Sequence, residues 1–182
     1  RAAADYTFEE NVADGQAIFD LMLAVDRCPQ PVVGRVNGAA IGGGAGLVSC
    51  CDIVVAAERA TFGFSEARLG IVPAVISPFV LSRIGPSHAR ELFLTGERFD
   101  ARRAQAIGLV HHVVADSDLD AAVADRVAQL LQAAPGAQAA IKELIRVVAF
   151  QPKESVRDYT SGTIARCRAS DEGREGMSAF LE

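Results

Sequence analysis

The chain has 182 residues, and its 18 lysines and arginines against 23 aspartates and glutamates give a formal net charge of −5. This balance argues against a nucleic-acid surface, which needs clustered cations. Half of the residues are hydrophobic and they are spread along the chain, which favours a packed core over disorder. No apolar run approaches the roughly 20 residues that span a bilayer.

Strands and helices are predicted to alternate in the first half of the chain. Apolar residues at helical spacing predict a helix from Glu9 to Val25, which ends before Pro29. A strand-like run at Val32–Val36 leads into a turn and the glycine-rich segment 39–46. Next we expect a short buried helix at 47–51, a buried strand at 52–57, an extended piece at 61–64 and an irregular or single-turn segment at 65–70. This succession predicts an α/β fold.

Helices dominate the predicted second half, and Gly108 is a typical stop signal for one of them. The helices are predicted at 76–84, 87–94, 101–107, 119–133, 137–150, 155–169 and 172–180. A strand-like run contains His111 and His112, and His88 lies near a helix start. No Ser–His–Asp or Cys–His grouping is recognisable, so we interpret all three histidines as structural or exposed.

Four cysteines, Cys28, Cys50, Cys51 and Cys167, form no CxxC motif. The adjacent pair could form a disulfide only with backbone strain, so we expect neither a disulfide framework nor a metal site. Reduced thiols suit a cytoplasmic protein. The sequence opens at Arg1 without an initiator methionine or a signal-type apolar region, so we expect that the true amino terminus lies upstream.

The glycine run Gly42–Gly44 is the strongest local signal for chemistry. Residues without a Cβ let backbone N–H groups approach a ligand closely, and a helix that starts near Gly44 would favour a phosphate or a carbonyl oxyanion there. A tight contact between a helix and a strand explains the glycines equally well. A nucleotide site is disfavoured, because no P-loop Lys-Ser/Thr follows and Leu47 takes the last Gly position of a GxGxxG motif.

Glu66 is the second candidate, because its apolar neighbours would suit it to proton transfer near neutrality. The alternative is a half-exposed loop carboxylate paired with Arg68, and without further context the sequence favours this alternative.

Several motifs in order resemble the enoyl-CoA hydratase/isomerase (crotonase) superfamily. They are VNGAAIGGG at 36–44, CDI at 51–53 and ATFGFSEARLGIVP at 60–73. The segments 94–101, 106–110 and 170–180 resemble the same family, so the resemblance covers nearly the whole chain.

The resemblance implies a crotonase (ClpP-like) spiral of ββα units followed by a helical oligomerisation region. Residues 1–115 would form the carboxy-terminal part of the spiral core, and residues 116–182 the helical trimerisation region of a homotrimer or homohexamer. It implies an acyl-CoA thioester as substrate, with coenzyme A as part of that substrate, no metal and no other cofactor. We expect no nucleic-acid or membrane partner.

The resemblance also assigns roles to individual residues. Two backbone amides of the family hold the thioester oxygen; Gly43 matches the second, and the first would lie upstream of Arg1. Typical hydratases carry two glutamates, of which Glu66 matches one, whereas Gly46 stands at the position of the other. Glu66 would then perform both proton transfers, or an ordered water and another group would fill the gap.

The segment Pro73–Phe79 departs from the Pro-Gly and Gly-Gly-Thr-like run of two-glutamate hydratases. Ala74 keeps an N–H for water or Glu66, while apolar side chains in the segment would line an acyl site. The expected substrate-binding residues are Gly42, Gly44, Gly46, Pro73, Ala74, Val75, Ile76 and Phe79. The segment is similar to hydratases of the methylglutaconyl-CoA hydratase-like type, which implies fatty-acid metabolism or leucine degradation.

Three functions remain open from the sequence. The first is a lyase that hydrates a 2-enoyl-CoA, with the Gly43 N–H polarising the thioester carbonyl and Glu66 moving protons. The second is an enoyl-CoA isomerase that uses one glutamate. The third is an acyl-CoA-binding or oligomer-forming homologue without catalysis.

Overall fold

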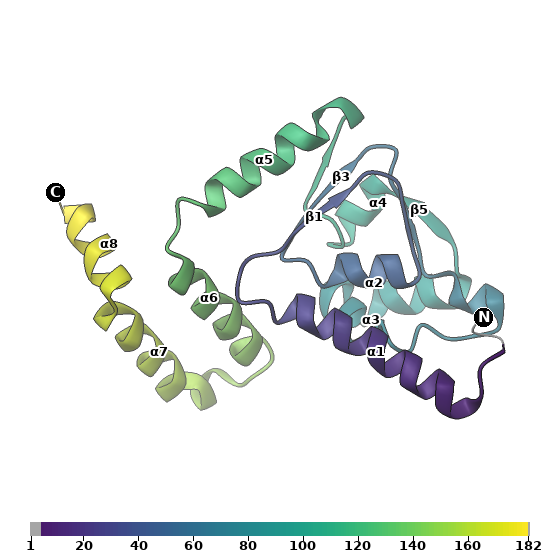
Figure 1. Ribbon diagram of the computed structural model, residues 1–182, viewed down its shortest axis with the longest axis horizontal. Helices are drawn as coiled ribbons and strands as arrows, with labels where there is room; N and C mark the ends of the chain where they lie inside the picture. The colour runs from purple at the N-terminus through teal and green to yellow at the C-terminus, as the bar shows by residue number, and fades with distance from the viewer. Residues whose placement is uncertain (1–4, 182) are drawn as a thin grey trace. The chain divides into compact units, whose positions relative to one another are not determined.

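The computed structural model describes residues 5–181, in which strands and helices alternate first and helices alone follow (Figure 1). The mixed α/β class that the sequence predicts is confirmed. The elements are α1 (Phe8–Asp26), β1 (Val33–Val36), β2 (Ala39–Ile41), α2 (Gly43–Ser49), β3 (Ile53–Ala57), β4 (Thr61–Gly63), the 3₁₀ turn η2 (Ser65–Leu69), α3 (Ser77–Thr95), β5 (Arg98–Asp100), α4 (Ala101–Ala106), β6 (His112–Val114), the 3₁₀ turn η3 (Asp116–Asp118), α5 (Leu119–Leu130), α6 (Pro135–Val148), the 3₁₀ turn η4 (Lys153–Val156), α7 (Arg157–Ala169) and α8 (Asp171–Leu181).

The chain divides into two compact units. The first contains α1 up to Cys28 and then Val32–Arg126, and the second contains Pro29–Pro31 and the chain from Val127 onward. The boundary falls within α5. The predicted segments 1–115 and 116–182 include residues 1–4 and 182, which lie outside the described residues, and their assignment as spiral core and trimerisation region stays a prediction.

Two small sheets form the frame of the first unit. In one, β3 lies between β1 and β6 with all pairs parallel, and Val55 pairs with both Arg35 and His112. In the other, β4 lies between β2, which is parallel to it, and β5, which is antiparallel. The sequence did not predict β2 and β5; β2 lies inside the segment 39–46, which was interpreted as a glycine-rich turn.

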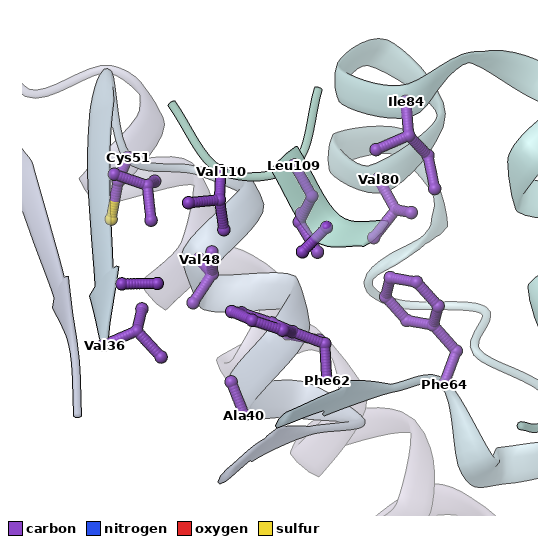
Figure 2. Close-up of a cluster of buried hydrophobic side chains, with 14 of the residues drawn as sticks. Val36, Ala40, Val48, Cys51, Phe62, Phe64, Val80, Ile84, Leu109 and Val110 are labelled. Carbon is purple, nitrogen blue, oxygen red and sulfur yellow. The ribbon is translucent and has the colours of Figure 1, made fainter. Parts of the chain in front are cut away.

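Buried side chains from both sheets meet the helices in one hydrophobic cluster (Figure 2). Phe62 and Phe64 on and beside β4 are fully buried, and the Phe62 ring stacks on Phe99 with centroids 5.9 Å apart. Val48 of α2 and Val80 of α3 belong to the same cluster. The segment that carries Glu66 therefore starts from a fixed aromatic anchor.

Local signals explain where the helices begin and break. Thr7 caps α1 in a capping box, since its hydroxyl accepts from the Glu10 N–H at 3.2 Å and its own N–H donates to the Glu10 carboxylate at 2.7 Å. The break expected between 84 and 87 is confirmed within α3, where Gly85 has a φ of 72° and precedes Pro86.

The second unit contains the end of α5 and the helices α6, α7 and α8. The Gly136 N–H at the start of α6 donates to both carboxylate oxygens of Glu172 on α8, at 3.2 and 3.0 Å, which ties the two helices together. Within residues 5–181 no helix combines the length and the apolarity needed to cross a bilayer.

Candidate active site

The glycine segment between β2 and α2 is fixed by its backbone. Gly42 has a φ of 56°, a conformation that residues with a Cβ rarely adopt, and its N–H donates to the Gly63 carbonyl at 2.9 Å. This turn lets α2 begin at Gly43, earlier than the helix predicted at 47–51. The N–H groups of Gly43 and Gly44 belong to the first helical turn, where no intrahelical acceptor exists, and both residues are exposed. They are the amides that the sequence singled out.

The other end of α2 is closed by side chains that the sequence did not identify. The Ser49 hydroxyl donates to the Ala45 carbonyl at 3.0 Å, and the Cys50 and Cys51 thiols donate to the carbonyls of Gly46 and Leu47 at 3.3 and 3.5 Å. Burial, with smaller contributions from Asp26 and Cys51, raises the pKa of the Cys50 thiol to about 12, so the proton needed for donation stays in place. In this helix of seven residues, the carbonyls of Ala45, Gly46 and Leu47 thus accept hydrogen bonds from side chains.

Glu66 lies on η2, two residues after the buried Phe64, and points toward the glycine segment. Its Oε1 is 3.1 Å from the place that a Cβ on Gly42 would take. Its Oε2 is buried and has no hydrogen-bond partner among the described residues. A buried carboxylate oxygen without a partner is costly to maintain and is available to a bound molecule. The structure therefore brings the two sequence candidates, Glu66 and the glycine run, together.

Arg68 does not form the ion pair that the alternative interpretation of Glu66 required. Its Nε donates to the Thr95 carbonyl at 3.2 Å, and its side chain lies against Gly96 at the end of α3. Arg68 is thus a structural residue, and a pairing with Glu66 is not observed within residues 5–181.

The segment 73–79 divides into exposed and buried positions. Ala74 is exposed, but its N–H donates to the Val72 carbonyl at 2.8 Å, so the expected availability of this amide to Glu66 is not observed. Phe79 is buried with its ring 5.4 Å from that of Phe19. Pro73 and Val75 are half-buried. Their binding of an acyl group stays a prediction.

Gly46 is buried in the second turn of α2 and leaves no space for a side chain. A Cβ there would stand 2.5 Å from Ile76 Cγ2 and 2.9 Å from Met22 Cε. Met22 was not a candidate from the sequence, because nothing local links α1 to α2.

A separate polar cluster surrounds His111, beside β3. The His111 Nδ1 accepts from the Val54 N–H at 2.9 Å and lies 3.2 Å from Arg83 Nη2. Partial burial of the ring, although the residue as a whole is exposed, and then the charge of Arg83 lower the pKa of His111. His111 is therefore structural, as expected from the sequence. Among the described residues, no group of three His, Cys, Asp or Glu side chains is arranged to hold a metal ion.

Comparison with known proteins identifies relatives of this chain. The family model for enoyl-CoA hydratase/isomerase matches residues 3–182. The carnitinyl-CoA dehydratase of Salmonella typhi is 36% identical over 170 residues, which cover 91% of this chain and 62% of that protein.

Solved structures agree with the sequence match. An enoyl-CoA hydratase from Shewanella pealeana superposes with a TM-score of 0.93 at 42% identity, over 98% of this chain and 67% of that one. An enoyl-CoA hydratase from Mycobacterium smegmatis gives a TM-score of 0.94 at 31% identity, over 99% of this chain and 70% of that one. The chain thus spans between 62% and 70% of the length of these three proteins.

Proposed function

Because the chain belongs to the enoyl-CoA hydratase/isomerase family, we propose that it acts as a hydratase that adds water across the double bond of a 2-enoyl-CoA thioester. The single observation that carries the proposal is the approach of the Glu66 carboxylate to the glycine segment that begins α2. A proton-transfer group and a backbone N–H for a carbonyl oxygen are then presented side by side.

The chemistry assigns one task to each group. As the oxygen of water bonds to the β carbon, negative charge moves through the α carbon to the thioester oxygen, where the Gly43 N–H stabilises it. Glu66 accepts a proton from water and delivers a proton to the α carbon. One carboxylate thereby completes the addition without a net change in its own protonation.

The relatives support the substrate class. The names of the Shewanella and Mycobacterium proteins state enoyl-CoA hydratase, and that of the Salmonella protein states a CoA-thioester dehydratase, the reverse type of reaction. We extend the acyl-CoA substrate and the water addition to this chain as a proposal, with coenzyme A as part of the substrate. A branched substrate of the 3-methylglutaconyl-CoA type, a place in leucine degradation and a cytoplasmic location belong to the same proposal.

The test is the hydration of crotonyl-CoA and of 3-methylglutaconyl-CoA, followed by loss of the conjugated thioester absorbance. Glu66→Gln keeps the shape of the side chain but cannot accept or deliver a proton, so kcat should fall by about 100-fold or more. Glu9→Gln, an exposed change on α1, is the matched control and should retain activity. Unchanged turnover in Glu66→Gln would remove Glu66 from this role.

An isomerase is the second candidate, favoured by the absence of any side chain at Gly46. With Glu66 alone, a proton would move from the α carbon to the γ carbon of a 3-enoyl-CoA. Turnover in ¹⁸O-labelled water separates the two reactions, because only the hydratase product carries solvent oxygen. Binding of the thioester without any product would indicate the non-catalytic homologue instead.

A further inference from the structure

The backbone of Gly46 faces two buried side chains, those of Ile76 and Met22. A Cβ at position 46 would stand 2.5 Å from Ile76 Cγ2 and 2.8 Å from Ile76 Cβ, closer than real Cβ contacts come. Ile76 is 4% exposed and Met22 is 3% exposed, so neither can move into solvent. The Met22 contact is with its terminal methyl, which is flexible, whereas the Ile76 atoms sit next to the backbone. Ile76 is therefore the fixed obstacle.

Position 46 is hydrogen-bonded to Gly42, the residue that precedes α2 and faces Glu66. The Gly46 N–H donates to the Gly42 carbonyl at 3.0 Å, and the Cβ position of Gly42 is 3.1 Å from Glu66 Oε1. Gly42, which precedes α2, thus meets Glu66, and Gly46, four residues later, meets Ile76. A displacement of α2 at Gly46 would be passed to Gly42 through that hydrogen bond.

We propose that Ile76 is a positioning residue that restricts this site to one carboxylate. It occupies the volume that any side chain at position 46 needs, and its contact with the bare Gly46 backbone holds α2 where Gly43 and Glu66 can act together. The inference rests on the proposed function, because it assumes that Glu66 carries the proton transfers. Its consequence is that Glu66 must both accept the proton of water and protonate the α carbon.

A melting-temperature series tests the contact without any reference to activity. Gly46→Ala should lower the melting temperature. Adding Ile76→Val should not restore the melting temperature, because valine keeps both crowded atoms, Cβ and Cγ2. Adding Ile76→Ala should restore it in part, and adding Ile76→Gly should restore it most. Gly176→Ala on α8, where a Cβ would meet nothing within 4 Å, is the control. The inference would be overturned if Gly46→Ala lowered the melting temperature no more than Gly176→Ala does, or if all three Ile76 changes restored the melting temperature equally.

A second experiment tests the restriction to one carboxylate. Gly46→Glu should lower kcat/KM for crotonyl-CoA by about tenfold or more, and Gly46→Glu with Ile76→Gly should recover at least about threefold of that loss. The acid limb of the pH profile should then change from one ionisation to two, which a merely structural role would not produce. A recovered double variant with a single ionisation would overturn the inference. If the unaltered chain neither hydrates nor isomerises an enoyl-CoA, the proposed function fails. The melting-temperature series still tests the contact between Ile76 and Gly46 in that case.

Discussion

His111 uses one ring nitrogen as an acceptor, and this makes the stability of the first unit sensitive to pH. Its Nδ1 accepts from the Val54 N–H and faces the guanidinium of Arg83, and a proton on that nitrogen would remove the acceptor. Partial burial of the ring, Arg83 and His112 all lower the pKa of His111, while Asp52 opposes them. Arg83 is half-buried, and this burial lowers its own pKa.

The direction of the pH effect follows from the lowered pKa. Above the ordinary value of 6.5 the imidazole is neutral in both the folded and the unfolded chain, so His111 adds no pH dependence. As the pH falls below 6.5, the unfolded chain takes up a proton that the folded chain refuses, and the free energy of unfolding should decrease. Urea midpoints between about pH 7.5 and about pH 5.5 measure this decrease.

The His111→Gln variant should lose part of that pH dependence, because glutamine does not titrate. His88→Gln, which changes an exposed histidine on α3, should keep the dependence of the unaltered chain. Equal slopes of the urea midpoint against pH in the unaltered chain and in His111→Gln would contradict the assignment.

The partners of Glu66 and Arg68 could not be predicted from the sequence alone. Glu66 and Arg68 are two residues apart, which made an ion pair between them a reasonable alternative. Arg68 instead bonds to the Thr95 carbonyl, 27 positions away, and Glu66 turns toward Gly42. Both partners are tertiary, so no local pattern could have ranked them, whereas the resemblance to the crotonase motifs did place Glu66 in the site.

At the scale of elements, Gly42 is the position on which the start of α2 depends. Its φ of 56° lies in a region that L side chains rarely adopt, and a Cβ would crowd Glu66 at 3.1 Å. Gly42→Ala should therefore lower the free energy of unfolding by about 1–3 kcal/mol and reduce activity with it. Gly38→Ala is the control, because a Cβ there would meet nothing within 4 Å and its φ is not positive.

Urea unfolding of the two glycine variants checks this expectation. A Gly42→Ala variant as stable as Gly38→Ala would mean that the backbone of the segment is free to relax, and the fixed turn before α2 would have to be given up. Equal stability with lost activity would point instead to the crowding of Glu66.

The predicted elements that agree best with the structure are those whose sequence signals are local. The helix expected at Glu9–Val25 is observed at Phe8–Asp26, and the strand expected at 52–57 is observed at Ile53–Ala57. The sequence left the start of α2 open between Gly44 and Leu47, and the observed start at Gly43 depends on a turn at Gly42 whose N–H bonds to Gly63 in another strand. The thiols that close α2 were considered only as possible disulfide or metal groups.

At the scale of the whole molecule, the assembly implied by the family resemblance has a candidate surface in the second unit. Ile141 and Ile145 lie four residues apart on one face of α6 and are 52% and 59% exposed. Large apolar side chains that share a helix face and remain in water are typical of an interaction surface. We propose that this face contributes to a homotrimer or homohexamer.

Light scattering after size-exclusion chromatography tests the proposed assembly. The full chain should elute with three or six times the monomer mass, and Ile145→Glu should shift it toward the monomer, because burying an unpaired carboxylate in an interface is costly. Gln132→Glu adds the same charge at another exposed position and should leave the mass unchanged. A monomeric unaltered chain would exclude the assembly, and an Ile145→Glu variant that stays oligomeric would move the interface away from this face of α6.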